Sequence, residues 1–176
     1  QAQGRRRQRR RDGKLNGRPM QNVAEVFDDK SVVQEALENF AALLEDADFT
    51  AELELMGIGR MQFMRRRQML VEWRGLYMAL WRLALSSSFP QDAEHIFATF
   101  LHAYRIAHPD KLSARIMERA QQYWGMLQPK GDADFCDVAR HLGSFSVQDE
   151  KQARSLTLRL VLHIRRAYKI IFDRLI

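Results

Sequence analysis

Apolar residues recur at steps of three and four along most of this chain, and no segment shows sustained alternation of apolar and polar residues. The first spacing places side chains on one face of an α-helix, whereas a strand with one buried face needs the second. The nine glycines and four prolines stand mostly between the apolar segments, which is typical of helical proteins. The pattern therefore predicts an all-α fold, a single compact helical bundle.

We expect about six helices, with a long central helix and a long C-terminal helix. The string SVVQ has the form of a capping box, and it predicts that the first helix begins at Ser31 and ends in the acidic cluster at 45–48. The further helices are expected over residues 60–85, 91–107, 109–127, 133–142 and 147–176, with a short one over 50–56.

The expected central helix has two different faces. One is apolar and consists of Met69, Trp73, Leu76, Leu80 and Leu83. The opposite face alternates arginine with apolar residues, namely Arg60, Met64, Arg67, Val71, Arg74, Met78 and Arg82. Two interpretations of this second face stay open. Its arginine stems lie across neighbouring helices and pair with acids such as Glu35, Glu38 and Glu45, or it forms a basic groove for a nucleic acid or a partner.

The expected C-terminal helix also has two faces. Its apolar stripe consists of Leu156, Leu160, Ile164, Ala167, Ile171 and Leu175. Its other side carries Arg159, Arg166 and Lys169, with Arg165 at the margin. Such a helix suits phosphate, an acidic membrane or an acidic partner helix. The simpler interpretation, which we prefer, is a solvated face on a surface helix.

Positive charge is concentrated at the start of the chain. The formal net charge is +6, yet residues 1–18 alone carry eight basic residues and one acid, and the remaining 20 basic and 21 acidic residues sum to −1. The eight are Arg5, Arg6, Arg7, Arg9, Arg10, Arg11, Lys14 and Arg18. Such a run cannot bury apolar surface, so we expect a disordered arm over 1–18 and a helical bundle domain over 19–176.

Catalytic and metal-binding patterns are missing from the sequence. It contains no HExxH, no paired cysteines, no glycine-rich phosphate loop and no GxSxG. We therefore expect a non-enzymatic protein with no cofactor and no metal site. The single cysteine, Cys136, favours a reducing compartment, so an intracellular, cytoplasmic location is expected. The most apolar stretch, residues 76–85, is too short for a transmembrane segment and contains Arg82.

One short string resembles a known family. The tripeptide His108-Pro109-Asp110 is similar to the signature of the J-domain family of Hsp70 cochaperones, and the resemblance covers about a quarter of the chain. It implies that these three residues contact an Hsp70 and promote its ATP hydrolysis. The family's second helix is strongly basic and its following loop is longer, whereas residues 96–107 here carry only Arg105 and His102. Proline at a helix start explains the string without a family, so it remains a third alternative.

The expected function is nucleic-acid binding, with the arm on the phosphate backbone of RNA or DNA. The arm has no aromatic residue that could stack on bases, which favours backbone contact. Candidates for further contacts from the bundle are Arg60, Arg67, Arg74, Arg159, Arg166 and Lys169. The alternative is a helical interaction module or adaptor, in which the second face of the central helix packs against a protein partner or a second copy in a homodimer.

Overall fold

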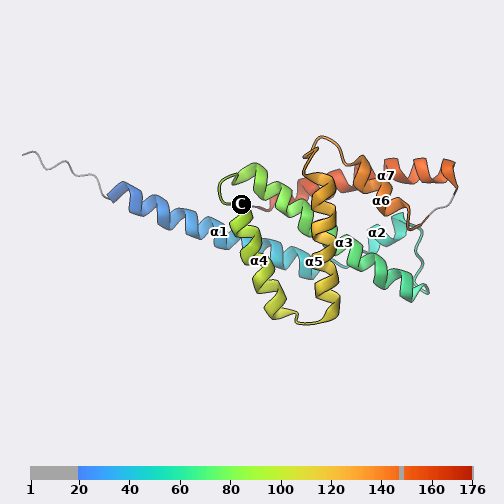
Figure 1. Cartoon of the computed structure of the whole chain (residues 1–176), viewed down its shortest axis with the longest axis horizontal. Coiled ribbons are helices and arrows are strands. Elements are labelled where there is room, and N and C mark those ends of the chain that lie inside the picture. Colours follow the sequence, from blue (N-terminus) through green and yellow to red (C-terminus); the bar gives the residue numbers. More distant parts are fainter. Residues whose placement is uncertain (1–19, 147–148, 176) are drawn as a thin grey trace, which may run out of the picture.

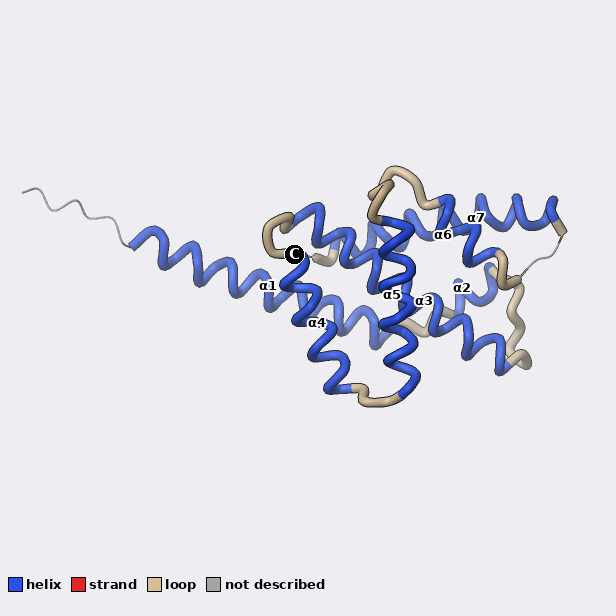
Figure 2. The backbone as a smooth tube through the Cα atoms, viewed as in Figure 1, coloured by secondary structure: helices blue, strands red, loops and turns tan. Residues whose placement is uncertain are grey.

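The computed structural model describes residues 20–146 and 149–175, and the predicted arm at 1–18 lies outside them. Within these ranges the chain forms helices and no strand, as predicted (Figure 2). The helices are α1 (Met20–Asp46), α2 (Thr50–Leu55), α3 (Phe63–Ser88), α4 (Ala93–Ala107), α5 (Lys111–Leu127), α6 (Cys136–Gly143) and α7 (Glu150–Asp173).

The predicted start of the first helix is wrong. Helix α1 begins at Met20, so Ser31 lies inside it rather than at its N-cap. No glycine or proline separates Met20 from Ser31, so nothing in the intervening sequence ends a helix there. The bounds of the other helices lie within three residues of those predicted.

Helix α3 runs through the middle of the molecule, where α5 crosses it (Figure 1). Helices α4 and α5 form a hairpin beside it, α6 and α7 pack together on another side, and α1 extends away from the body. Both predicted apolar stripes, on α3 and on α7, are buried throughout, which confirms the two predicted core faces.

The crossing of α3 and α5 is unusually close. It centres on Gly75, which has no side chain to hold the two backbones apart. A Cβ added there would lie 2.5 Å from Cβ of Arg119 and 3.0 Å from the backbone nitrogen of Ala120. Non-bonded heavy atoms in contact lie farther apart than this, so the crossing requires glycine at this position.

Among the described side chains, two acidic ones are buried, and each forms hydrogen bonds with other helices. Glu72 of α3 is 1% exposed; it accepts a hydrogen bond from Tyr123 Oη at 2.8 Å and pairs with Arg119 Nε at 2.9 Å. Burial and the nearby Glu72 carboxylate raise the pKa of Tyr123. These bonds join α3 to α5 in the middle of the bundle.

The second buried acid, Glu52, joins α2 to α3 and α7. Its Oε1 accepts a hydrogen bond from Tyr77 Oη at 2.8 Å and lies 2.9 Å from His163 Nε2. Burial raises the pKa of Glu52, but the hydrogen bonds from His163 and Tyr77 outweigh it, and the pKa is lower than usual.

We expect the free energy of unfolding of Glu52→Gln to fall less with decreasing pH than that of the wild type. A carboxyl group with a lowered folded-state pKa stabilises the fold above its unfolded pKa, and this contribution is lost as the pH falls through the folded value. The free energy of unfolding of the wild type should therefore fall more steeply than that of the variant below pH 4.5. Urea unfolding across this range measures it, with Glu54→Gln on the exposed side of α2 as control. Equal acid slopes for the two variants would contradict the assignment.

Candidate nucleic-acid interface

The predicted nucleic-acid residues of the bundle fall in three separate places. Arg60 is exposed in the turn before α3, which begins at Phe63 and not at the predicted Arg60, and Arg67 is exposed near the start of the helix. Arg74 is half-buried further along α3. Arg159, Arg166 and Lys169 of α7 are exposed and lie on the outer side of that helix. The eight basic residues of the arm lie outside the described residues.

The start of α3 combines exposed arginine with exposed apolar side chains. We call residues 60–67, with sequence RMQFMRRR, the α3 tip. Met61, Phe63 and Met64 are 82%, 69% and 80% exposed, whereas most large apolar residues of the described helices are buried. Phe63 and Arg67 are one helical turn apart and therefore share a face. The α3 tip thus offers an aromatic ring and a guanidinium side by side.

Other features make the α3 tip electropositive. No acidic residue occurs between Glu54 and Glu72. The N-cap residue, Gln62, makes no side-chain cap, and the first turn of α3 contains no acid. The amide N–H groups of that turn and the positive end of the helix dipole are therefore not matched by a carboxylate, and such an end favours phosphate. Arg65 Nη2 donates to the Phe145 carbonyl at 3.1 Å, which anchors the tip to the loop after α6.

The second face of α3 does not form one continuous surface. Val71 and Met78, which alternate with the arginines, are 1% and 0% exposed. The interpretation of this face as a basic groove for a nucleic acid or a partner is therefore wrong for its buried C-terminal half. Neighbouring helices cover its C-terminal half, and only the α3 tip remains open to solvent.

For Arg82 the first interpretation of this face is correct, because its side chain lies across neighbouring helices. Its guanidinium lies 4.3 Å from the ring centre of Trp124 and pairs with Glu94, with Nε 3.1 Å from Oε1. The acid therefore comes from α4 and not from the predicted Glu35, Glu38 or Glu45 of α1. Arg82 consequently holds α3, α4 and α5 together.

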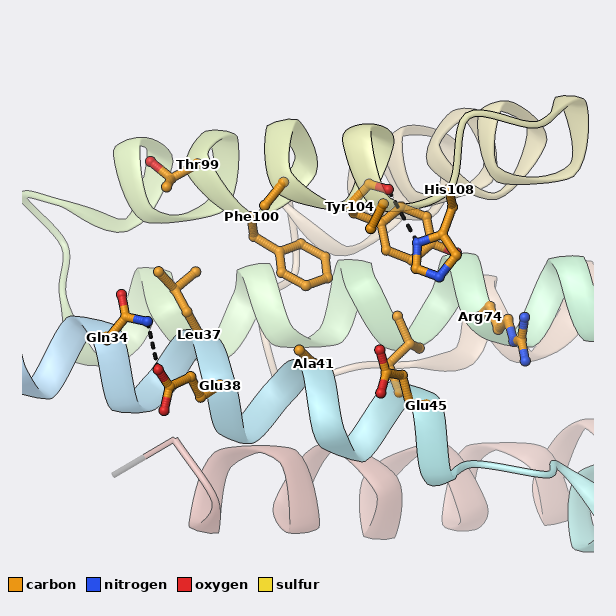
Figure 3. Close-up of a pocket in the computed structure, with 13 residues that line it drawn as sticks. Gln34, Leu37, Glu38, Ala41, Glu45, Arg74, Thr99, Phe100, Tyr104 and His108 are labelled. Atoms are coloured by element: carbon orange, nitrogen blue, oxygen red, sulfur yellow. Dashed lines mark hydrogen bonds between the residues drawn. The ribbon is translucent and has the colours of Figure 1, made fainter.

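Arg74 lies at one end of a groove between α1 and α4 (Figure 3). The groove has a volume of about 500 Å³. Phe100 and Tyr104 of α4 point toward α1 across it. Nε of Arg74 is buried and has no hydrogen-bond partner among the described residues. Arg74 therefore belongs to this groove and not to the surface of the α3 tip.

The outer face of α7 mixes cations with apolar side chains. Leu158 and Leu162 are 63% and 51% exposed, and Arg159 and Arg166 lie beside them. Lys169 differs, because its Nζ pairs with Asp173 at 2.8 Å. The predicted cations are thus exposed as expected, but their neighbours are leucines.

The tripeptide His108-Pro109-Asp110 connects α4 to α5, and two of its residues have local structural roles. Asp110 is the N-cap of α5 and accepts a hydrogen bond from the Ser113 amide at 2.8 Å. The ring of His108 lies against the ring of Tyr104, with the ring centroids 4.5 Å apart. These contacts account for the string through helix capping and packing.

Residues 20–146 and 149–175 contain no group of three or more side chains of the kinds that hold a metal ion. None of the helices described for this chain is long and apolar enough to cross a membrane.

Comparison with known proteins gives no relative. No family model, no curated protein and no solved structure matches this chain.

Sequence reasoning missed Phe63, Met61 and the groove between α1 and α4. One signal was available for the α3 tip, namely an arginine-rich run with no acid that follows two glycines. The groove has no such signal, because two helices that are far apart in sequence create it.

Proposed function

We propose that this chain is a non-enzymatic nucleic-acid-binding protein, in which the arginine-rich arm holds the phosphate backbone and the α3 tip contacts an unpaired strand. The observation that carries the proposal is the exposed Phe63 among arginines at an uncapped helix start. Unpaired bases stack on exposed aromatic rings regardless of sequence, while nearby cations hold the phosphates.

The two parts contribute differently to binding. The arm supplies charge, and each phosphate that it neutralises releases counterions, so its contribution falls steeply with salt. Phe63 supplies stacking, which salt weakens little and which a base-paired duplex does not offer. The α3 tip therefore favours single strands over duplexes.

Binding of a mixed-sequence single strand and a duplex at several salt concentrations tests this. Deletion of residues 1–18 should lower the log–log salt slope by several units, about 0.7 for each lost single-strand contact. Phe63→Ala should weaken single-strand binding by about 1–3 kcal/mol with the salt slope unchanged, because one stacked base is lost. Duplex binding should change little.

Phe172→Ala is the matched control, since Phe172 is another exposed phenylalanine, on α7. If the two alanine variants bind a single strand equally, the α3 tip has no part in binding. If the full chain binds neither nucleic acid at low salt, the proposed function is wrong. The alternative of a protein-interaction module would then be favoured, because the α1–α4 groove is an apolar surface of the kind that a helix can fill.

A further inference from the structure

Two surfaces of this molecule remain without a partner among the described residues, and they complement each other. One is the groove between α1 and α4, and the other is the outer face of α7 around Leu158 and Leu162. We propose that the outer face of α7 from one copy docks into the α1–α4 groove of a second copy, so that the chain associates head to tail.

The groove has the form that accepts a helix. Its walls are α1 residues 34–45 and α4 residues 99–107, with His108 after them, and they span about three turns of helix. Small side chains line it at Ala41, Ala103 and Ala107, and these let another backbone approach closely. Leu37 and Phe100 supply apolar contact area along it (Figure 3).

The acidic side chains of the groove lie along its α1 wall, and Arg74 lies at one end of it. Glu38 and Glu45 line its α1 wall, both exposed, and neither forms an ion pair with a described residue. They are seven residues apart, so they lie two turns apart on the same side of α1. The facing α4 wall carries small and neutral side chains such as Thr99 and Ala103. An occupant should therefore carry two cations along one edge of an apolar strip.

The outer face of α7 has this pattern. Leu158 and Leu162 are one turn apart and form the apolar strip. Arg159 and Arg166 lie along one edge of it, and they too are seven residues apart. Neither arginine forms an ion pair with a described residue. Docking would bury the two leucines among the alanines and place the arginines against Glu38 and Glu45.

This complementarity favours a second copy over a nucleic acid at this face. The acidic wall of the groove repels phosphate, and exposed leucines gain nothing from a charged backbone. The groove and the α7 face are different surfaces of each copy, so the contact is heterologous and joins copies into a ring or an open chain. The assignment is independent of nucleic-acid binding at the α3 tip.

Sedimentation velocity of the full chain without nucleic acid, over a range of concentrations, tests the contact by charge exchange. The groove variant carries Glu38→Arg with Glu45→Arg, and the α7 variant carries Arg159→Glu with Arg166→Glu. All four side chains are exposed, so folding should be retained. Each variant should associate at least about tenfold more weakly than wild type. Association should return when all four substitutions are combined in one chain or when the two variants are mixed.

Lys111→Glu with Arg115→Glu changes the net charge as the α7 variant does, on exposed positions of α5, and should associate like wild type. A chain that begins at Pro19 should also associate like wild type. Loss of association on that deletion would assign the groove to the arm and overturn the proposal. A wild type that stays monomeric, or a combined variant that stays dissociated, would overturn it as well.

Discussion

Replacing Glu72 with alanine is expected to lower the free energy of unfolding by about 3–5 kcal/mol, the range for breaking a buried ion pair. The substitution removes the acceptor for Tyr123 Oη and the partner of Arg119 Nε, and it leaves a cavity in the centre of α3. Tyr123 is fully buried, so its hydroxyl would have no water to replace the carboxylate. Arg119 is 30% exposed and can reach solvent, which places the effect toward the lower end of the range.

Urea unfolding at neutral pH measures this effect. Glu54→Ala on the exposed side of α2 is the control for the loss of one carboxylate, and it should change the free energy of unfolding by less than about 0.5 kcal/mol. Tyr123→Phe removes only one of the two interactions and should cost about 1 kcal/mol. If Glu72→Ala matches Glu54→Ala, the buried carboxylate contributes nothing to stability.

Helices and core faces could be predicted because their signal is local. The three- and four-residue spacing of apolar neighbours predicts that Trp73 and Leu160 are buried, and both are fully buried. Glu72 shows the limit of that reasoning. A glutamate is expected at the surface, and its burial depends on Tyr123, which lies 51 residues further along the chain.

The candidate site could be predicted only in part, for the same reason. The sequence places Arg60, Arg67 and Arg74 on one helical stripe, but α3 begins at Phe63, so Arg60 precedes the helix and only Arg67 and Arg74 belong to it. Packing against other helices divides the stripe, so two of these arginines face solvent at the α3 tip and the third lines the groove. Phe63 is not among the predicted site residues, because the spacing of apolar residues alone does not distinguish an exposed phenylalanine from a buried one.

Replacing Gly75 with alanine is expected to lower the free energy of unfolding by about 1–3 kcal/mol, the usual cost of overpacking. The added Cβ would clash with Cβ of Arg119 and with the backbone at Ala120. A flexible side chain could change its rotamer to relieve the clash, whereas the backbone cannot. Thermal and urea unfolding measure the effect. Gly125→Ala is the matched control, because Gly125 is also helical and has no atom within 4 Å of an added Cβ.

The control, Gly125→Ala, should raise the free energy of unfolding. Alanine in an open helical position stabilises by roughly 0.5–1 kcal/mol relative to glycine, so the two glycine variants should differ in sign. Equal stability of both variants would mean that α5 moves away from α3 at little cost. Arg119 also links this prediction to the first one, because it is both the obstacle to a Cβ at Gly75 and the partner of Glu72. A displaced α5 already weakens the Glu72 pair, so Gly75→Ala combined with Glu72→Ala should cost less than the sum of the single effects.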